Sequence, residues 1–426
     1  MHFKMMKNIA EIIHSIFMRI RLWGIKGIYD YLLRQFSNFK LHFFFLSNAR
    51  KYPLVPEYGI TILADMTLQS SLSKTMRDLV FALRKANIPF QTFDLHPGKD
   101  LPSTDIKNLL TPTDEFRILK YNHVIEMFSS PLPKKLPIKR SRIIFWEFTT
   151  GLLEYNPIVA NAETIIAMSD FNFNVFKKIL PETAHIKKIL YPFFFDSETI
   201  PDKTTIRGKY GIPDNAIVVF FNFDYGSSFN RKNPDGSLRA FANAFANTED
   251  AFLVFKTKGA ARHQEERCKL LDLAAELNIH QRMIMIDSYI PQHDIYGLTN
   301  ACDIYLSLHR GEGFGLGIVE AMSLAKPVIV TNYSSTTEFC NPTNSIPIPY
   351  SIVKVPDDMH DHPCYHAVKE WAEPDIDAAA NALRKLYDNP TLRTEIGRAA
   401  QTSVNDHFST EHFKESISSF LQDSKL

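Results

Sequence analysis

Two series of short apolar runs, separated by stretches of helical periodicity, constrain the fold of this chain more than any other feature. The first series comprises the runs 59–64, 123–128, 142–148, 164–168 and 185–190. The second comprises the runs 216–223, 251–256, 283–286, 303–308 and 328–331. Such runs are typical of strands buried in a parallel sheet, and residues 71–86 have the single apolar face expected of a covering helix.

The segment 192–215 lies between the two series and is interrupted by three prolines and two glycines, which places a domain junction there. A chain of 426 residues is also long enough for two hydrophobic cores. Two successive series predict an α/β protein with two Rossmann-like domains that face each other across a cleft. We expect an N-terminal domain at 52–195, a C-terminal domain at 196–390, and helices at 391–426 that cross back to the N-terminal domain or stay apart from it.

The composition argues against several classes of protein. The chain has 48 Lys and Arg against 47 Asp and Glu, so no strong field favours nucleic acid as a partner. Its four cysteines form no CxxC pair, which is typical of a reducing compartment. No apolar stretch reaches the roughly 18 residues of a membrane span, and charges interrupt the N-terminal segment where a secretion signal would lie. We therefore expect a cytoplasmic protein.

Residues 1–51 differ from the rest of the chain. They contain nine Lys and Arg residues, two acidic residues and ten aromatic residues. Two interpretations stay open: a helical extension that packs on the main domains, or a basic, aromatic segment that lies on an anionic membrane. The second interpretation makes the protein peripheral on the inner face of the plasma membrane.

The stretch RGEGFGLGIVEAMSLAKPVIVT, residues 310–331, joins the end of a predicted strand to a helix. Glycine occupies every second position from 311 to 317. Glycine is unfavourable inside a helix, but in a loop it lets backbone approach a ligand closely. Free amides at a helix start bind phosphate, and open α/β sheets bind ligands at the carboxyl ends of their strands. The loop is therefore expected to bind an anionic ligand.

Glu312 and Glu320 narrow this expectation, because a carboxylate beside a phosphate is useful only where hydroxyl groups donate to it. Helical side chains lean toward the helix start, so Glu320 can reach a ribose next to the phosphates. Glu312, in the loop itself, can reach hydroxyls on the other side. A nucleotide-sugar has hydroxyls on both sides of a diphosphate. In the structural alternative, Glu320 is a favourable charge near a helix N-terminus and Glu312 is a solvated loop residue.

Cationic side chains follow two of the strands at the same sheet edge. Arg231 and Lys232 come after the run 216–223, and Lys256 ends the next run. Arginine grips phosphate oxygens in pairs, and lysine adds a point charge. These residues can neutralise a diphosphate, so we expect neither a metal ion nor a cofactor.

The combination of segments resembles a known family. The stretch DIYLSLHRGEGFGLGIVEAMSLAKPVIVTNYSSTTEF is similar to the retaining glycosyltransferases of the GT-B fold, specifically glycosyltransferase family 4. The hallmark of that family is a pair of glutamates separated by seven residues, here Glu312 and Glu320. RKNP at 231–234 and WAEPD at 371–375 resemble a bacterial branch of the family. The resemblance is dense over about 216–390.

The resemblance implies roles for the site residues. Glu320 would hold the ribose hydroxyls of an NDP-sugar donor, and Glu312 would contact hydroxyls of the transferred sugar. Arg231 and Lys232 would neutralise the departing diphosphate, and the loop 287–294 would border the base. Three further residues would present backbone groups to the sugar and the phosphates: Gly313, Phe314 and Gly315.

The N-terminal half is less similar to the family. Relatives often carry a glycine-rich acceptor loop after the first strand, whereas this chain has MTLQSSLSK at 66–74. Trp146 and Glu147 are expected to face the cleft on the acceptor side. His123 is a candidate for the histidine that many relatives place near the reacting centre, with a structural histidine as the alternative.

The segment HDHPCYH brings His360, His362, Cys364 and His366 close together in sequence. Such residues can bind zinc. Ligands at four alternate positions of one short segment cannot easily surround a tetrahedral ion, so we expect no metal site there.

The expected reaction transfers a hexose from an NDP-sugar to a hydroxyl of a glycan or a lipid-linked acceptor with retention, in bacterial surface polysaccharide synthesis. A dinucleotide oxidoreductase would need a GxGxxG motif near the first strand, where ILADMTLQSS has no glycine. The other alternative is a non-catalytic sugar-nucleotide-binding protein on the same fold. We expect the side chains of Glu320 and Lys232 to lie outside the core.

Overall fold

The computed structural model describes residues 58–67, 70–95, 110, 121, 123–127, 138–152, 159, 162–195, 200–360 and 365–423. Contacts between Cα atoms divide the chain into two compact units. The first comprises Met1–Val80 and Ile88–Arg140, and the second comprises Phe81–Asn87 and Ser141–Leu426.

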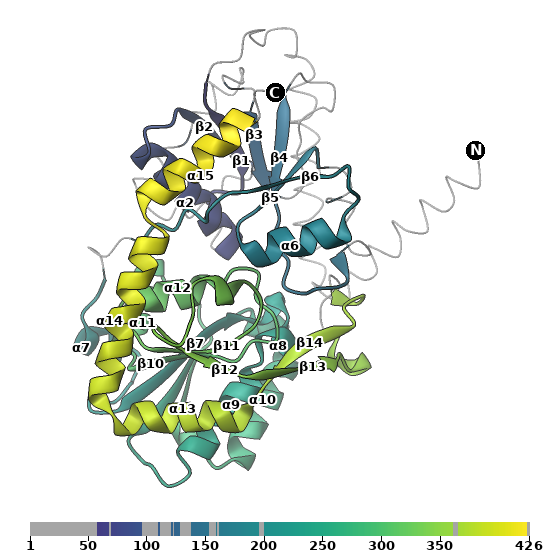
Figure 1. The fold of residues 1–426 in the computed structure, drawn as a ribbon. Coiled ribbons are helices and arrows are strands. Elements are labelled where there is room, and N and C mark those ends of the chain that lie inside the picture. Colours follow the sequence, from purple (N-terminus) through teal and green to yellow (C-terminus); the bar gives the residue numbers. More distant parts are fainter. Residues whose placement is uncertain are drawn as a thin grey trace. The chain divides into compact units, whose positions relative to one another are not determined.

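The described strands form two six-stranded sheets and one two-stranded sheet (Figure 1). The first six-stranded sheet has the order β2-β1-β3-β4-β5-β6, and its identified strand pairings are parallel. Its strands are β1 (Ile60–Ala64), β2 (Phe90–Asp94), β3 (His123–Met127), β4 (Lys139–Ile143), β5 (Thr164–Ala167) and β6 (His185–Lys188). The helices that alternate with these strands are α2 (Ser71–Lys85) and α6 (Asp170–Ile179).

The second sheet has the order β12-β11-β10-β7-β8-β9, again with parallel pairings. Its strands are β7 (Ile217–Asp224), β8 (Ala251–Lys258), β9 (Met283–Ile286), β10 (Ile304–Ser307), β11 (Val328–Thr331) and β12 (Ile346–Ile348). The helices around it are α7 (Lys203–Lys209), α8 (Phe229–Lys232), α9 (Pro234–Ala244), α10 (Gln264–Glu276), α11 (Gln292–Ala301), α12 (Leu316–Ser323) and α13 (Ile376–Asp388).

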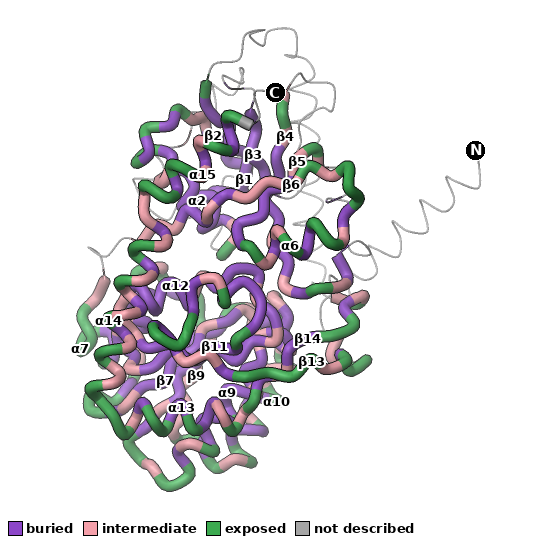
Figure 2. Tube along the Cα trace, viewed as in Figure 1, coloured by how far each residue is buried: buried purple, intermediate pink, exposed green. Residues whose placement is uncertain are grey.

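The core of this sheet follows the predicted apolar runs. Every residue of β10 and β11 is buried, as are Val218–Phe221 of β7. Figure 2 shows that buried residues gather around the strands of this sheet. Leu238 and Phe241 of α9 pack in the same cluster as Leu383 of α13, so these two helices cover one face. The fold prediction is confirmed: two parallel sheets with covering helices make an α/β protein of two Rossmann-like sheets.

An antiparallel hairpin follows the second sheet and was not predicted. It consists of β13 (Tyr350–Lys354) and β14 (Glu370–Pro374), which contains the WAEP residues. The strand β2 was also missed, because FQTFD mixes polar and apolar residues without a clear run.

The predicted strand 142–148 is shorter than expected. Strand β4 ends at Ile143, and the residues that follow leave the sheet. At Trp146 the side chain of Asn172 takes the place of a neighbouring strand, because it pairs with both the backbone N–H and the carbonyl of that residue. Trp146 and Glu147 therefore lie on a loop at the carboxyl end of β4.

The chain ends in two helices, α14 (Pro390–His407) and α15 (Thr410–Asp423). Helix α14 approaches the turn after α12 so closely that a Cβ atom at Gly397 would overlap the carbonyl of Ala325. Helix α15 lies against the end of β6, where Ser416 Oγ accepts from the Leu190 N–H at 2.8 Å.

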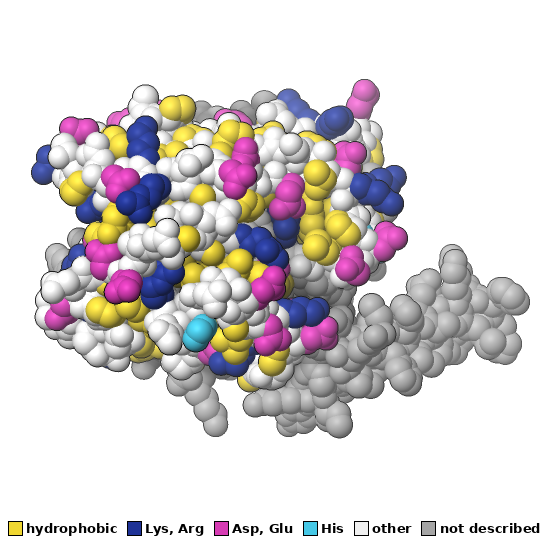
Figure 3. Space-filling model, turned by 90° about the horizontal axis from the view of Figure 1, so that it is seen from below, with side chains coloured by type: hydrophobic (Ala, Val, Ile, Leu, Met, Phe, Trp, Pro, Cys, Tyr) yellow, Lys and Arg dark blue, Asp and Glu magenta, His cyan; other side chains and the backbone are white. Residues whose placement is uncertain are grey.

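The described surface mixes charges of both signs. On the face in Figure 3, Lys and Arg side chains alternate with Asp and Glu side chains and with apolar ones. Among the residues that the structure describes, no helix is both long enough and apolar enough to cross a membrane. The segment 1–51 lies outside the described residues, so both interpretations of it stay untested.

Candidate active site

The two predicted cations lie on a single helical turn after β7. Ser228 begins α8 by accepting from the Arg231 N–H at 3.2 Å, and Asn233 ends it in the left-handed conformation with φ of 55°. Asn233 also begins α9 and donates from its amide to the Leu308 carbonyl at 2.8 Å. The asparagine of RKNP therefore fixes the cationic turn to the end of the neighbouring strand β10.

Arg231, Lys232, Glu312 and Glu147 form one charge cluster. Lys232 Nζ donates to Glu312 Oε2 in a short ion pair. Arg231 Nη1 lies 3.6 Å from the same oxygen, and Arg231 Nη2 lies 3.9 Å from Glu147 Oε1. The structure thus brings together the three residues predicted for catalysis and one of the two acceptor-side candidates.

Burial and neighbouring opposite charges together shift the pKa values of the residues in this cluster. Burial alone would raise the pKa of Glu312, but Lys232, Arg231 and His309 outweigh it and lower that pKa to about 2. Burial lowers the pKa of Lys232 despite the attraction of Glu312. Burial also raises the pKa of Glu147, and Arg231 opposes this only in part. Glu312 is therefore ionised at neutral pH, while Glu147 is the carboxyl group that holds a proton more readily.

The guanidinium of Arg231 is already held by protein acceptors. Nη1 donates to the Gly311 carbonyl at 2.8 Å, and Nη2 donates to the Ser227 carbonyl at 2.8 Å and to Ser227 Oγ at 2.9 Å. The residue is only 2% exposed. Lys232, whose side chain is 17% exposed, is the more accessible of the two cations.

Arg310 is a residue of this loop that the sequence did not single out. Its guanidinium pairs with both carboxylate oxygens of Glu373, at 2.5 and 2.8 Å, and lies 4.8 Å from the centre of the Trp371 ring. Its backbone N–H donates to the Arg231 carbonyl at 2.8 Å. The WAEP residues therefore anchor the glycine loop, and a bidentate pair of this kind fixes orientation as well as position.

The glycines are explained in large part by close packing within the protein. A Cβ atom at Gly311 would lie 2.8 Å from the Glu147 carbonyl oxygen, and one at Gly317 would overlap the Tyr305 hydroxyl. Gly315 has φ of 98°, which favours glycine, and begins helix α12. The sequence predicted that glycine lets the loop backbone lie close to a ligand. The structure shows that the same residues also let the backbone lie close to neighbouring segments of the protein.

The side chain of Phe314 packs among other aromatic rings. Its ring stacks on Tyr191 with centroids 3.8 Å apart and lies 5.7 Å from the rings of Phe339 and Phe408. The expectation that Gly313, Phe314 and Gly315 present main-chain groups to a ligand stays untested.

Three residues that support the loop were missed by sequence reasoning. Ser334 Oγ accepts from the Glu312 N–H at 2.9 Å, and Ser335 Oγ donates to the Gly313 carbonyl at 2.7 Å. His309 is fully buried, and burial lowers its pKa to about 4 despite the nearby Glu312. All three lie within residues 303–339, which carry the resemblance to the family. The sequence alone does not distinguish them from other polar residues, because their role is visible only in their contacts.

Glu320 lies in the second half of α12 and is buried, at 4% exposed. The expectation that it lies outside the core was wrong, because the helix packs between β10 and β11 and covers this face. Burial, together with the nearby charge of Glu320, keeps the pKa of Tyr305 well above its usual range. Tyr305 therefore stays protonated and donates to Asn222 Oδ1 at 2.6 Å.

Lys256 lies beside Asn222 in the paired strands β7 and β8. Burial lowers the pKa of Lys256 to about 8, although Asp287 opposes the effect. Its Nζ donates to the Thr257 carbonyl at 2.5 Å. The structure places Lys256 at the predicted sheet edge but gives it no direct contact with Glu312 or Glu320 among the described interactions.

His123 belongs to the other unit and is the first residue of β3, where it pairs with Ile60. Burial and then Lys139 lower its pKa to about 4. Ligands of open sheets bind at the carboxyl ends of strands, and His123 lies at the amino end. This position favours the structural alternative for His123, and its acceptor role stays untested.

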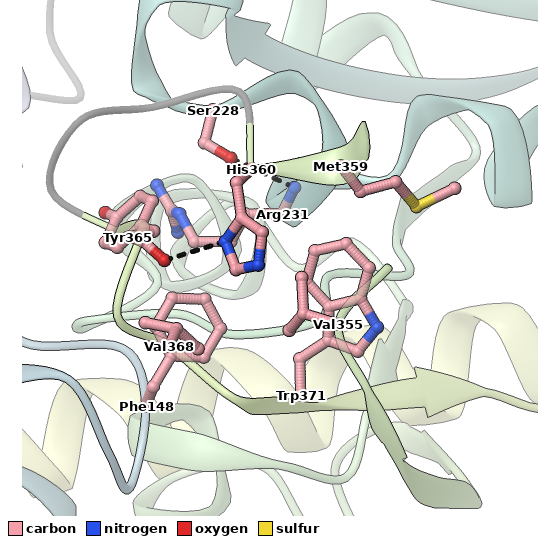
Figure 4. Close-up of a pocket in the computed structure, with 9 residues that line it drawn as sticks. All are labelled: Phe148, Ser228, Arg231, Val355, Met359, His360, Tyr365, Val368 and Trp371. Carbon is pink, nitrogen blue, oxygen red and sulfur yellow. Dashed lines mark hydrogen bonds between the residues drawn. The ribbon is translucent and has the colours of Figure 1, made fainter. Parts of the chain in front are cut away.

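A small pocket adjoins the charge cluster (Figure 4). Arg231 and Ser228 line it, and it encloses about 210 Å³ including the part open to solvent. The remaining walls come from Phe148, Val355, Met359, His360, Tyr365, Val368 and Trp371. His360 Nδ1 donates to the Tyr365 carbonyl at 3.0 Å, which leaves the other ring nitrogen as an acceptor in the neutral ring. His362 and Cys364 lie outside the described residues, so the expectation of no metal site there stays untested.

Comparisons of sequence agree on a class of enzyme. Residues 202–346 match the family model "Glycosyl transferases group 1". The chain is 23% identical over 325 residues to the alpha-1,3/1,6-mannosyltransferase ALG2 of Dictyostelium discoideum, covering 70% of each chain. It is 24% identical over 250 residues to a GDP-mannose-dependent monoacylated alpha-(1-6)-phosphatidylinositol monomannoside mannosyltransferase of Corynebacterium glutamicum, covering 57% of this chain and 55% of the relative.

A third relative, the serotype-specific mannosyltransferase WbdA of Escherichia coli, is 23% identical over 137 residues. That match covers 32% of this chain and 16% of the relative.

Solved structures share the fold. Anabaena Alr3699/HepE in complex with UDP-glucose superimposes with a TM-score of 0.58 at 15% identity, covering 86% of this chain and all of that one. A glycosyltransferase from Rickettsia africae gives 0.58 at 15% identity, with 87% and 99% covered. The architecture of the chain is therefore the GT-B fold. Residues 202–346 resemble the group 1 glycosyltransferases, and the relatives agree with the predicted resemblance to the family 4 glycosyltransferases of this fold.

Proposed function

We propose that this protein transfers a hexose from an NDP-sugar to a hydroxyl of a glycan or lipid-linked acceptor, with retention of anomeric configuration, in bacterial surface polysaccharide synthesis. The observation that carries the proposal is the charge cluster at the carboxyl edge of the second sheet. Lys232 and Arg231 meet Glu312 there, beside the start of α12. Cations and helix amides at one point suit a diphosphate leaving group.

Mannose is the first donor sugar to test. Three relatives are named mannosyltransferases, and one of them is named as GDP-mannose-dependent. Solved structures of the same fold contain UDP and UDP-glucose, so the base is a separate question. Sugar nucleotides of both GDP and UDP should therefore be tested as donors.

In this proposal Glu320 holds the ribose, Glu312 contacts the transferred sugar, and Arg231 and Lys232 stabilise the departing diphosphate. Lys256 adds positive charge at the same edge, and Glu147 faces the acceptor. Leaving-group stabilisation by these cations replaces a metal ion. We assign retention of configuration to same-face attack assisted by the donor phosphate.

The alternative is a protein that binds a sugar nucleotide without turning it over. One observation favours it: both cations are already occupied, Arg231 by backbone carbonyls and Lys232 by Glu312. For catalysis the diphosphate must displace Glu312 from Lys232.

A donor panel separates the two. The protein is incubated with GDP-mannose, UDP-glucose and UDP-N-acetylglucosamine, and melting temperature and NDP release are both measured. Stabilisation by about 2.7 kcal/mol is expected for a ligand at 100 times its Kd, together with slow NDP release. Stabilisation without release favours the binding protein. If no sugar nucleotide or NDP shifts melting at millimolar concentration, the donor assignment is wrong. NMR of the transferred sugar then tests retention.

A further inference from the structure

A buried network of uncharged side chains connects two loops of the candidate site. Its members are Ser169 and Asn172 at the start of α6, and Ser335 in the short helix η6 (Ser334–Glu338). Their exposed fractions are 1%, 0% and 1%. A buried polar group destabilises the folded protein unless it forms hydrogen bonds. A buried cluster of polar side chains that are hydrogen-bonded to one another therefore suggests a specific role.

The hydrogens of the network have one consistent arrangement. Ser335 Oγ lies 2.7 Å from the Gly313 carbonyl oxygen, and because a carbonyl only accepts, the Ser335 hydroxyl donates there. Ser335 Oγ then accepts from Ser169 Oγ at 2.9 Å and from Asn172 Nδ2 at 3.4 Å. Ser169 Oγ in turn accepts from the Asn172 backbone N–H at 3.1 Å. The single donor and both acceptor sites of the Ser335 hydroxyl are engaged.

At one end the network holds the loop that carries Glu147. Asn172 Oδ1 accepts from the Trp146 N–H at 3.1 Å, and Asn172 Nδ2 donates to the Trp146 carbonyl at 2.6 Å. Trp146 directly precedes Glu147. The amide of Asn172 therefore fixes the backbone from which the Glu147 side chain leaves.

At the other end it holds the loop that carries Glu312. Ser335 fixes the Gly313 carbonyl, and the neighbouring Ser334 accepts from the Glu312 N–H at 2.9 Å. The two loops also pack directly, since a Cβ atom at Gly313 would lie 3.1 Å from Phe145 Cβ. Close packing and the network act on the same pair of segments.

We propose that Asn172 and Ser335 are positioning residues that hold the Glu147 loop and the Glu312 loop at a fixed separation. The two carboxylates then flank Arg231, at 3.9 and 3.6 Å from its terminal nitrogens. The inference rests on the proposed function, because fixed carboxylates matter only if substrates react between them. Small displacements of reacting groups can lower rates about 100-fold, so such a connection would act on turnover.

The test compares Asn172→Ala, Ser335→Ala and the double variant with Ser345→Ala. Ser345 is a buried serine, 2% exposed, whose hydroxyl donates to the Asn341 carbonyl away from both loops. The control therefore loses a similar buried hydrogen bond. We expect kcat for NDP release to fall about 10- to 100-fold in each network variant while donor Kd stays unchanged. The double variant should be no slower than the slower single variant, because both act through one connection.

Hydrogen–deuterium exchange measures the connection without any substrate. In Asn172→Ala, exchange should rise at Trp146, which loses its hydrogen-bond partner. It should also rise at Glu312–Phe314, to which Asn172 is connected through Ser335. In Ser345→Ala neither segment should change. A rise confined to Trp146, or multiplicative kinetic losses in the double variant, would overturn the proposal. Absence of NDP release by the unmodified protein would instead contradict the proposed function and leave the exchange result to decide the network.

Discussion

At the scale of single residues, Glu312 occupies the place where a donor diphosphate is expected to meet Lys232. A bound donor must therefore exchange the lysine–carboxylate contact for a lysine–phosphate contact. In the proposed function, the carboxylate would then be released toward the transferred sugar, which is the group it is predicted to touch. Glu312 would thus be the counter-ion of Lys232 before binding and a hydroxyl acceptor afterwards.

The ionised state of Glu312 predicts a pH-dependent effect on stability. Its pKa of about 2 lies below the ordinary 4.5, so the stabilisation is present above about pH 4.5 and is lost as pH falls toward 2. The difference corresponds to about 3 kcal/mol. Glu312→Gln should therefore be less stable than the unmodified protein at pH 6, with a difference that shrinks toward pH 3. Urea unfolding at the two pH values checks this, and an equal difference at both would contradict the ionised pair.

Glu320 predicts an effect on donor affinity. Ribose hydroxyls do not change during the reaction, so bonds to them contribute equally before and during bond breaking. Because Glu320 is buried, Glu320→Gln is the appropriate change, since it keeps the shape of the side chain. Each charged hydrogen bond lost should weaken binding by roughly 1.5–3 kcal/mol and raise donor KM with little change in kcat. Steady-state kinetics measures both constants, with far-UV circular dichroism as the folding control. An unchanged KM with a reduced kcat would contradict the ribose role and indicate that Glu320 acts at the reacting centre.

At the scale of elements, the start of α12 is packed against β10 and β7. A Cβ atom at Gly317 would overlap the Tyr305 hydroxyl and lie 2.9 Å from Asn222 Oδ1. Gly317→Ala should therefore destabilise the fold by about 1–3 kcal/mol, although alanine is the better helix former. Gly208 in α7 is a matched control, because nothing lies within 4 Å of an added Cβ. Gly208→Ala should stabilise slightly. Equal melting shifts in both variants would show that the contact at Gly317 is not limiting.

The strands and the charge cluster were predicted from the sequence more completely than the side-chain partners were. Long apolar runs predicted ten strands, and the loop chemistry of RGEGFG and RKNP predicted where the charge cluster lies. Asn172, Ser335 and the Arg310–Glu373 pair were missed because their partners are 22 or more residues away in sequence. The burial of Glu320 was not predicted, because it depends on how α12 packs against β10 and β11. Local patterns predict elements, whereas side-chain partners depend on which elements meet.

At the scale of the whole molecule, the near-neutral net charge of +1 hides a local excess in residues 1–51. Nine basic residues less two acidic ones leave an excess of seven. Each basic residue near an anionic membrane contributes about 1 kcal/mol. The full chain should therefore sediment with phosphatidylglycerol vesicles at low salt and be released at high salt, whereas a chain lacking 1–51 should stay in solution. Binding that is unaffected by the deletion or by salt would favour a packed extension.

The central claim is that side-chain cations at the glycine loop drive cleavage of an NDP-sugar. The most direct measurement is kcat for NDP release by the unmodified protein and by Lys232→Ala, both in EDTA, with Lys269→Ala as control because Lys269 is an exposed lysine of α10. We expect activity to persist in EDTA, to match the unmodified protein in Lys269→Ala, and to fall about 10²- to 10³-fold in Lys232→Ala. Equal rates in Lys232→Ala and the unmodified protein, or activity abolished by EDTA and restored by manganese, would contradict the claim.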